Sequence, residues 1–384
     1  MRVPLLDLRR QNLPLEEELL EAFRRVVRSG QFILGPEVER FEAEAAAMAG
    51  ARYGIGVSSG TDAILVALMA LGIGPGDEVI CPSFTFFATA GCVARLGARP
   101  VFADSCAECF NIDPAGIERL IGPRTRAIIP VHLFGQAADM EPILAVARQH
   151  GLAVIEDAAQ AFGAEYRGKP VGALGDFGTV SFFPTKNLGA LGEAGLVVTN
   201  DAALAENARL LRNHGMQPRY YHSRIGGNFR LDAVQAALLA VKLPHLMEYT
   251  EGRQRHACLY QSALGGLRGV VTPVTHPDRD HIVNQYTVRV SGGARDGLRR
   301  HLEERGIASE IYYPVPLHRQ ECFRGFGPHA ALPVAEALAE EVLSLPVFPE
   351  MTEEEQKKQP GKKLGLLLVE MGFVNEDALI KAMG

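Results

Sequence analysis

Residues 53–71, YGIGVSSGTDAILVALMAL, carry the pattern from which the fold can be predicted. They begin with a five-residue apolar run, continue through a turn at residues 58–61 and end in an apolar stretch of helical length. A strand, a glycine-containing turn and a helix in this order bring backbone amides to a helix N-terminus, which is a geometry that binds anions. The stretch therefore predicts a strand over 53–57, a helix over 62–71 and a candidate anion site between them.

The same alternation of strand and helix continues along the chain. The pattern predicts strands at 78–80, 100–103, 127–131 and 153–155, and helices at 15–48 (with a break at residues 29–30), 87–96, 114–121 and 140–149. Alternating strands and helices are typical of an α/β fold with a mostly parallel sheet and helices on both faces. Such sheets bind ligands beyond the carboxyl ends of their strands.

The pattern changes in the second half of the chain. Helical patterns dominate beyond residue 203, and an apolar strand pattern at 282–290 is followed by two glycines. We expect a large domain over residues 1–250, a smaller C-terminal α+β domain over 251–356 and an atypical helical tail over 357–384.

Composition narrows the class of protein. The chain has 384 residues, 47% of them hydrophobic, and a net charge of −6, so it can bury a sizeable core but offers no basic field for nucleic acid. Six scattered cysteines are typical of a reducing compartment. No stretch predicts a signal peptide or a membrane span, so we expect a cytoplasmic protein without a membrane partner.

Three polar features follow predicted strands. The turn Ser58-Ser-Gly-Thr-Asp62 either binds an anion or simply caps the next helix. The segment Leu152-Ala-Val-Ile-Glu-Asp-Ala-Ala-Gln160 ends in adjacent carboxylates, which either face a cation, a metal or a sugar hydroxyl, or form an exposed acid pair. In residues 180–195, Lys186 is either a solvated surface charge or a Schiff-base nucleophile, because apolar surroundings favour its neutral amine.

Together the three features match the requirements of pyridoxal phosphate. This cofactor needs an anion site for its phosphate, a lysine for its aldehyde and an acid against its ring nitrogen. Opposite charges ~4 Å apart attract each other by about 4 kcal/mol at an effective dielectric constant near 20, which is enough to keep the ring protonated. We expect Lys186 to hold the aldehyde and Asp157 to face the ring nitrogen.

At this point a set of spaced motifs resembles the DegT/DnrJ/EryC1/StrS family of nucleotide-sugar aminotransferases, which are fold-type I pyridoxal phosphate enzymes. The resemblance runs from about residue 4 to residue 356. The motifs, in chain order, are Ser29-Gly-Gln-Phe-Ile-Leu-Gly35, Ser59-Gly-Thr-Asp-Ala63, Gly74-Pro-Gly-Asp-Glu-Val-Ile80, Thr85-Phe86, Glu156-Asp-Ala-Ala-Gln160, Ser181-Phe-Phe-Pro-Thr-Lys-Asn-Leu-Gly189, Gly227-Asn-Phe-Arg-Leu-Asp232 with Gln235-Ala-Ala237, and Tyr313-Pro-Val-Pro-Leu-His318.

The resemblance implies a role for each matching residue. Lys186 matches the lysine that forms the Schiff base and then moves the proton, and Asp157 matches the partner of the ring nitrogen. Gln160 matches a residue near the ring hydroxyl, and Phe86 an aromatic that stacks on the ring. Gly60, Thr61 and Ser181 match phosphate contacts. Asn228 matches a residue that reaches the phosphate from the other subunit of a homodimer. Arg230, Tyr312 and His318 match segments that line the substrate site. For Tyr312 and His318 a packed, hydrogen-bonded loop is the alternative.

The implied reaction is ping-pong transamination. Glutamate gives its amino group to the cofactor, and a keto-sugar linked to a nucleoside diphosphate then takes it, in the synthesis of amino sugars for surface polysaccharide or secondary metabolites. Related sugar dehydratases carry histidine at the position of Lys186, so the lysine favours transamination. A non-catalytic, pyridoxal phosphate-binding regulatory protein is the other alternative.

Two further interpretations are weaker, and one segment departs from the family. Gly72-Ile-Gly-Pro-Gly76 resembles a dinucleotide-binding loop but precedes a strand rather than a helix. Cys106-Ala-Glu-Cys109 lacks a second pair at zinc-binding spacing, so no metal is expected. After residue 356 the family pattern ends, and residues 363–371 and 375–383 predict two short helices. The stretch Lys363-Leu-Gly-Leu-Leu-Leu-Val-Glu-Met-Gly372 is similar to the start of the N-terminal domains of bacterial type II secretion and pilus ATPases. The tail is either a fusion, a docking appendage or a substitute for the closing helix of the family.

Overall fold

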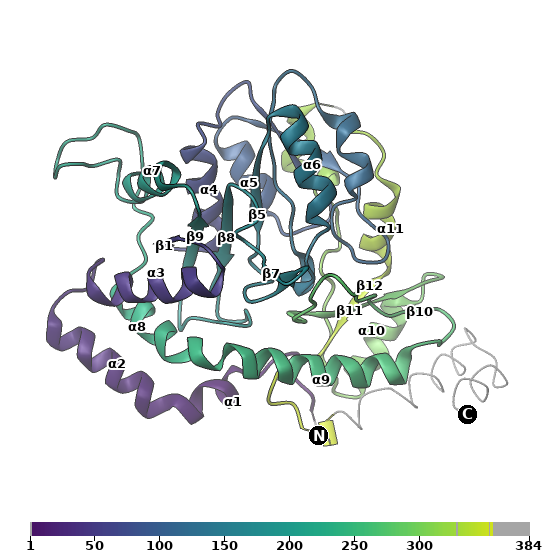
Figure 1. Ribbon diagram of the computed structural model, residues 1–384. Helices are drawn as coiled ribbons and strands as arrows, with labels where there is room; N and C mark the ends of the chain where they lie inside the picture. Colours follow the sequence, from purple (N-terminus) through teal and green to yellow (C-terminus); the bar gives the residue numbers. More distant parts are fainter. Residues whose placement is uncertain (1, 328, 353, 356–384) are drawn as a thin grey trace.

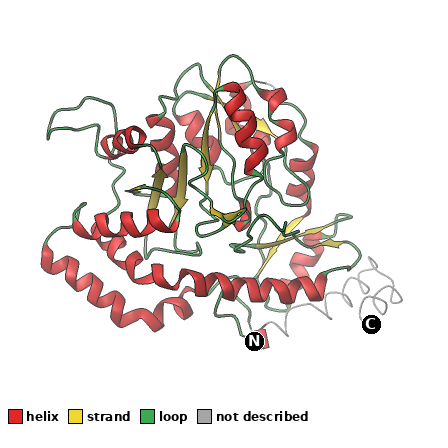
Figure 2. Ribbon diagram, in the orientation of Figure 1, coloured by secondary structure: helices red, strands yellow, loops and turns green. Residues whose placement is uncertain are grey.

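The computed structural model describes residues 2–327, 329–352 and 354–355. Its centre is a seven-stranded sheet in the order β1 (Tyr53–Val57), β9 (Gly195–Thr199), β8 (Phe177–Ser181), β5 (Ala153–Asp157), β4 (Thr125–Ile128), β2 (Glu78–Pro82) and β3 (Arg99–Ala103). Strand β9 runs antiparallel to β1 and β8, and the remaining pairs are parallel. The predicted mostly parallel α/β sheet is confirmed (Figures 1 and 2).

Helices cover both faces of this sheet, and each face has its own apolar cluster. One cluster includes residues of α2 (Glu16–Ser29), α3 (Pro36–Met48), α6 (Met140–His150) and α8 (Ala233–Lys242). The other includes residues of α4 (Gly60–Ala70), α5 (Ala88–Arg95), α7 (Ala202–Arg212) and α11 (Pro333–Glu341).

Helix α4 is the element that positions the anion site. It is apolar on all sides, with every residue from 63 to 68 buried, so it can only be stable inside the protein. It packs on strands β8 and β9 and between helices α5 and α7. This packing holds its N-terminus beside the carboxyl end of β8.

A smaller antiparallel sheet follows, formed by β10 (Val270–Val271), β11 (Tyr286–Val290) and β12 (Val342–Leu345). It packs with α10 (Arg295–Glu304) and with the end of α9 (Leu246–Leu264) in a third apolar cluster. Helix α9 starts in the first cluster with Leu246 and ends in the third with Leu264. The division of the chain near residue 250, which falls inside this helix, stays a prediction.

The remaining elements are short. They are α1 (Leu8–Asn12), β6 (Glu165–Tyr166), β7 (Lys169–Pro170) and the 3₁₀ helices at 13–15, 114–116, 118–120, 133–135, 243–245, 317–319 and 321–326. Among the described residues, no helix is both long and apolar enough to span a membrane. The described part of the chain also contains no group of three or more His, Cys, Asp or Glu side chains placed to hold a metal ion.

Two predicted elements were wrong in detail. The helix predicted over 114–121 is two 3₁₀ turns, Pro114–Gly116 and Glu118–Leu120, because Gly116 lowers helix propensity in the middle of the segment. The strand predicted over 127–131 ends at Ile128, two residues before Pro130, which has no N–H to donate to a neighbouring strand. The two helices predicted after residue 362 lie outside the described residues.

Candidate active site

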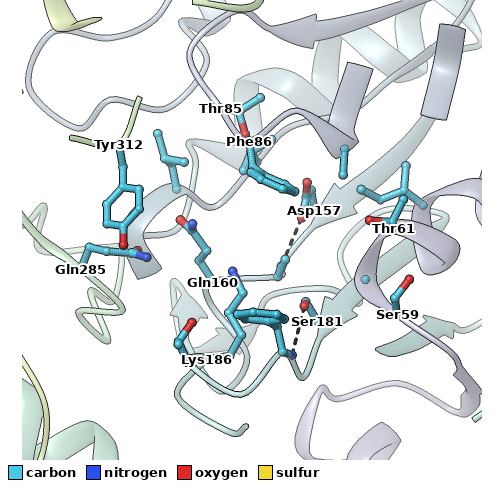
Figure 3. A pocket seen from close by; sticks show the side chains of 18 of the residues that line it. Ser59, Thr61, Thr85, Phe86, Asp157, Gln160, Ser181, Lys186, Gln285 and Tyr312 are labelled. Atoms are coloured by element: carbon cyan, nitrogen blue, oxygen red, sulfur yellow. Dashed lines mark hydrogen bonds between the residues drawn. The ribbon is translucent and has the colours of Figure 1, made fainter. Parts of the chain in front are cut away.

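A cavity of about 490 Å³ lies where β5 and β8 end and α4 begins. Asp157 is the last residue of β5, Ser181 is the last of β8 and Gly60 is the first of α4. The predicted site residues that line the cavity are Gly60, Thr61, Phe86, Asp157, Gln160, Ser181, Lys186 and Tyr312. The cavity therefore brings together eight of the eleven residues singled out in the sequence, and all of these except Gly60 are labelled in Figure 3.

The N-terminus of α4 forms one end of this cavity. The Ser59 hydroxyl caps the helix by accepting the backbone N–H of Asp62 at 3.1 Å, and Gly60 approaches β8 closely. A Cβ atom at Gly60 would lie 2.5 Å from the Cβ atom of Ser181, which no ordinary packing allows. Glycine is thus required here so that the amides of the first helical turn and the Ser181 hydroxyl can face the same point. Capping and anion binding, alternatives at the level of sequence, are compatible in this geometry.

Asp157 is buried at the inner wall of the cavity. Its Oδ2 atom accepts a hydrogen bond from the Thr89 hydroxyl at 2.8 Å, and its Oδ1 atom accepts one from the Ala159 N–H at 3.2 Å. Burial raises the pKa of the carboxyl, while these two hydrogen bonds and the charge of Lys186 oppose the rise. The arrangement fixes one carboxylate in a position where a cationic ring would stabilise its charge.

The adjacent Glu156 points to the opposite face of β5 and has a different task. It is completely buried, and its carboxylate accepts the backbone N–H groups of Gly172, Leu174 and Gly175 at 2.7–2.8 Å. His132 accepts the Ala138 N–H at Nδ1, so its Nε2 carries the proton and donates to Glu156 at 3.1 Å. Glu156 therefore holds a loop together, and only Asp157 of the predicted acid pair faces the cavity.

Lys186 lies in a turn just after β8, where its backbone N–H donates to the Phe183 carbonyl at 2.8 Å. The side chain is half-buried at the cavity (Figure 3). Loss of solvent lowers the pKa of its amine from 10.5 to about 8, although the charge of Asp157 opposes this shift. A lysine in this state has a substantial neutral fraction near neutral pH, which a nucleophilic amine requires.

Several cavity residues were not singled out from the sequence. Thr85 is buried, and its hydroxyl has no hydrogen-bond partner among the described residues. Gln285 and Tyr313 also line the cavity, and Tyr313 lies within 3.4 Å of the Gln160 amide. The Thr85-Phe86 motif was a signal for Thr85 and the motif that begins at Tyr313 was one for Tyr313. Gln285 carried no signal, because the segment before β11 reaches the cavity only through folding.

Three predicted residues do not line the cavity. Arg230 donates to Asn213 Oδ1 at 2.8 Å, and Asn228 is exposed beside it. His318 is buried with both ring nitrogens engaged, one at 2.6 Å from the Ser83 hydroxyl and the other at 2.9 Å from Glu336. In this single chain His318 thus matches the alternative of a packed, hydrogen-bonded loop.

The cavity fits pyridoxal phosphate in size and chemistry. It offers a helix N-terminus for the phosphate, a carboxylate for the ring nitrogen and an amine for the aldehyde. Two observations besides these point to a bound ring: the buried Thr85 hydroxyl lacks a partner among the described residues, and the cavity-lining Phe86 is 57% exposed. A flat, polar-edged ligand would satisfy the hydroxyl and cover the aromatic face.

The chain is similar to known proteins over nearly its whole length. The chain is 53% identical over 362 residues to "Pleiotropic regulatory protein" of Geobacillus stearothermophilus, covering 93% of this chain and 96% of the relative. It is 49% identical over 353 residues to the UDP-N-acetyl-3-dehydro-alpha-D-glucosamine 3-aminotransferase of Acidithiobacillus ferrooxidans, covering 92% and 95%.

A solved structure and a family model extend this likeness. The crystal structure of DesV from S. venezuelae in complex with a ketimine intermediate matches with a TM-score of 0.92 and 44% identity, over 98% of this chain and 100% of that one. The model of the DegT/DnrJ/EryC1/StrS aminotransferase family matches residues 14–359. This match over most of the chain, together with relatives about half identical over nearly its whole length, shows that this chain belongs to the DegT/DnrJ/EryC1/StrS aminotransferase family.

Proposed function

We propose that this protein is a pyridoxal phosphate-dependent aminotransferase that moves an amino group from glutamate to the keto-sugar of a nucleoside-diphosphate sugar. The observation that carries the proposal is the meeting of the Lys186 amine and the Asp157 carboxylate in one cavity, next to a helix N-terminus. Family membership supports the same reaction and the same cofactor.

Each residue has a definite task in this reaction. When bound, pyridoxal phosphate supplies an electron sink that stabilises negative charge on the carbon next to the transferred nitrogen. Asp157 stabilises the protonated ring nitrogen and Thr89 holds that carboxylate in place. The amine of Lys186, whose pKa is lowered to about 8, would hold the aldehyde and would serve as the base that moves the proton. Gly60, Thr61 and Ser181 would hold the phosphate and so keep the cofactor in position relative to Lys186.

We propose a UDP-linked 3-keto sugar as the first substrate to test. The A. ferrooxidans relative, at 49% identity, is named for a UDP-linked 3-dehydro sugar and for transfer to carbon 3. The negative net charge of the chain will not attract a nucleotide, so local amides and a few arginines must hold it. We propose that the reaction takes place in the cytoplasm, in amino-sugar synthesis for surface polysaccharide or secondary metabolites.

We further propose that the enzyme is a homodimer in which Asn228 reaches the phosphate site of the other subunit. Asn228 is exposed and does not line the cavity of its own chain. Several large apolar side chains are exposed, which is typical of an interface with another protein. Phe23 and Val27 lie on α2, Phe32 and Ile33 follow this helix, and Ile225 lies three residues before Asn228. Mixing a Lys186→Ala subunit with an Asn228→Ala subunit tests this: activity should return in the mixture if the sites are shared, and stay absent if they are not.

One amino-transfer assay separates the proposed function from two alternatives. The G. stearothermophilus relative is named as a regulatory protein, which favours the alternative of a non-catalytic pyridoxal phosphate-binding protein. Because position 186 is a lysine rather than a histidine, a sugar dehydratase function is disfavoured. Purified protein should transfer ¹⁵N from labelled glutamate to the keto-sugar nucleotide. Cofactor binding without transfer to any keto-sugar would support the regulatory function, and deoxygenated product would support dehydration.

A further inference from the structure

A second buried lysine lies behind the segment that presents Lys186. Lys242 is the last residue of α8, and its side chain is only 1% exposed. Its ammonium group donates to the backbone carbonyl of Gly189 at 2.6 Å. Burial also lowers the pKa of this lysine to about 8, but unlike Lys186 it does not line the cavity. Burying an ammonium group costs free energy, so a lysine at this position is expected to have a specific role.

The carbonyl that Lys242 holds belongs to the lysine loop, which we define as residues 182–190. The loop is closed at its base by a hydrogen bond from the Ala190 N–H to the Phe182 carbonyl at 2.8 Å. Gly189 lies directly against Pro184, since a Cβ atom at Gly189 would be 2.2 Å from the Pro184 carbonyl oxygen. Pro184 precedes Lys186 by two residues. A shift of Gly189 would therefore be transmitted to the backbone that carries the reacting amine.

The other side of the lysine loop is anchored separately. Asn187 donates to the Ile282 carbonyl at 3.0 Å and accepts from Asn284 at 2.8 Å. Lys186 thus lies between one anchor on the segment before β11 and one on α8. Because packed protein interiors transmit small displacements, the loss of either anchor should loosen the lysine loop.

We propose that Lys242 is a positioning residue for the reacting lysine: by donating to the Gly189 carbonyl from α8 it fixes the lysine loop and so places the Lys186 amine at the cofactor. This inference rests on the proposed aminotransferase function. Lys242 makes no contact with the reacting atoms itself. Its substitution should change how fast Lys186 acts rather than how tightly substrate binds.

The test compares Lys242→Met with Tyr260→Phe. Both changes remove a donor to a buried backbone carbonyl, since the Tyr260 hydroxyl donates to the Pro346 carbonyl at 2.8 Å, far along the chain from the lysine loop. The first measurement is amide hydrogen exchange of peptides covering residues 182–190 in cofactor-free protein. Exchange should become faster in Lys242→Met and stay as in wild type in Tyr260→Phe.

The second measurement is the single-turnover reaction of cofactor-loaded protein with glutamate. A misplacement of about 1 Å can cost a reacting group up to about 100-fold in rate, so Lys242→Met should lower the maximal rate roughly 10- to 100-fold while the half-saturating glutamate concentration stays within about twofold. Tyr260→Phe should leave both unchanged. If Lys242→Met does not fold, Lys242→Gln, which keeps a shorter N–H donor, should show the same changes to a smaller degree.

Unchanged exchange and rate in the folded variant would overturn the inference, as would equal effects in Tyr260→Phe. If wild-type protein does not react with glutamate or any other amino donor, the proposed function fails instead. Amide exchange in the cofactor-free protein still decides whether Lys242 fixes the lysine loop in that case.

Discussion

The substitution Gly60→Ala tests the phosphate end of the cavity. The new Cβ atom would lie 2.5 Å from Ser181 Cβ and 3.1 Å from Ser181 Cα, whereas ordinary contacts begin at 3.4 Å. The first turn of α4 and the end of β8 must therefore separate by about 1 Å. A phosphate bound to both at normal hydrogen-bond distances would then lie out of range of one of them.

The loss can be estimated from this geometry. One hydrogen bond to a charged group contributes about 1.5–3 kcal/mol, so the dissociation constant of pyridoxal phosphate should rise roughly 10- to 150-fold. Titration of cofactor-free protein, followed by the visible absorbance of the bound cofactor, measures the change. Gly74→Ala is the matched control, because a Cβ atom there meets nothing within 4 Å and should leave affinity as in wild type. Affinity in Gly60→Ala within about twofold of wild type would refute the assignment of this end to the phosphate.

Three further predictions follow from the cavity walls. Asp157→Asn removes a charge whose attraction to a cationic ring contributes up to about 4 kcal/mol. Single-turnover rates should therefore fall roughly 100- to 1,000-fold, and a fall of less than about threefold would contradict the assignment of Asp157 to the ring nitrogen. Because only the neutral amine of Lys186 attacks an aldehyde, cofactor uptake should quicken as pH rises and level off above about pH 8–9; a rate still rising up to pH 10.5 would show an unperturbed lysine. Glu156→Gln weakens an anchor for three backbone amides, so the free energy of unfolding measured by urea denaturation should fall by about 1–3 kcal/mol with little change in glutamate turnover; a turnover reduced roughly 10-fold or more in the folded variant would place Glu156 in the reaction.

The sheet and the core of the site were predictable because both depend on local sequence. Strand β1 matches its predicted bounds, and the turn after it opens α4 as expected. In parallel sheets the carboxyl ends of strands meet at one edge, so the positions of Asp157 and Lys186 just after apolar strand patterns are enough to assign them to a common site.

The remainder of the site depends on contacts between distant segments. Thr89 reaches Asp157 across 68 residues, and Lys242 reaches Gly189 across 53. Strand geometry places the adjacent Glu156 and Asp157 on opposite sides of β5, but the sequence could not show which of them faces the cavity, because both sides of this strand are buried. His318 was drawn from a motif, and only the fold shows that Ser83 and Glu336 occupy its ring nitrogens.

The most direct test of the central claim is borohydride reduction of the cofactor-loaded protein, followed by mass spectrometry of its peptides. Reduction makes the bond between a lysine and the cofactor permanent, so the labelled lysine can be identified. The account predicts that the label is found on Lys186 and disappears in Lys186→Ala. A label on Lys242, whose pKa is also about 8, or no label on any lysine, would contradict it.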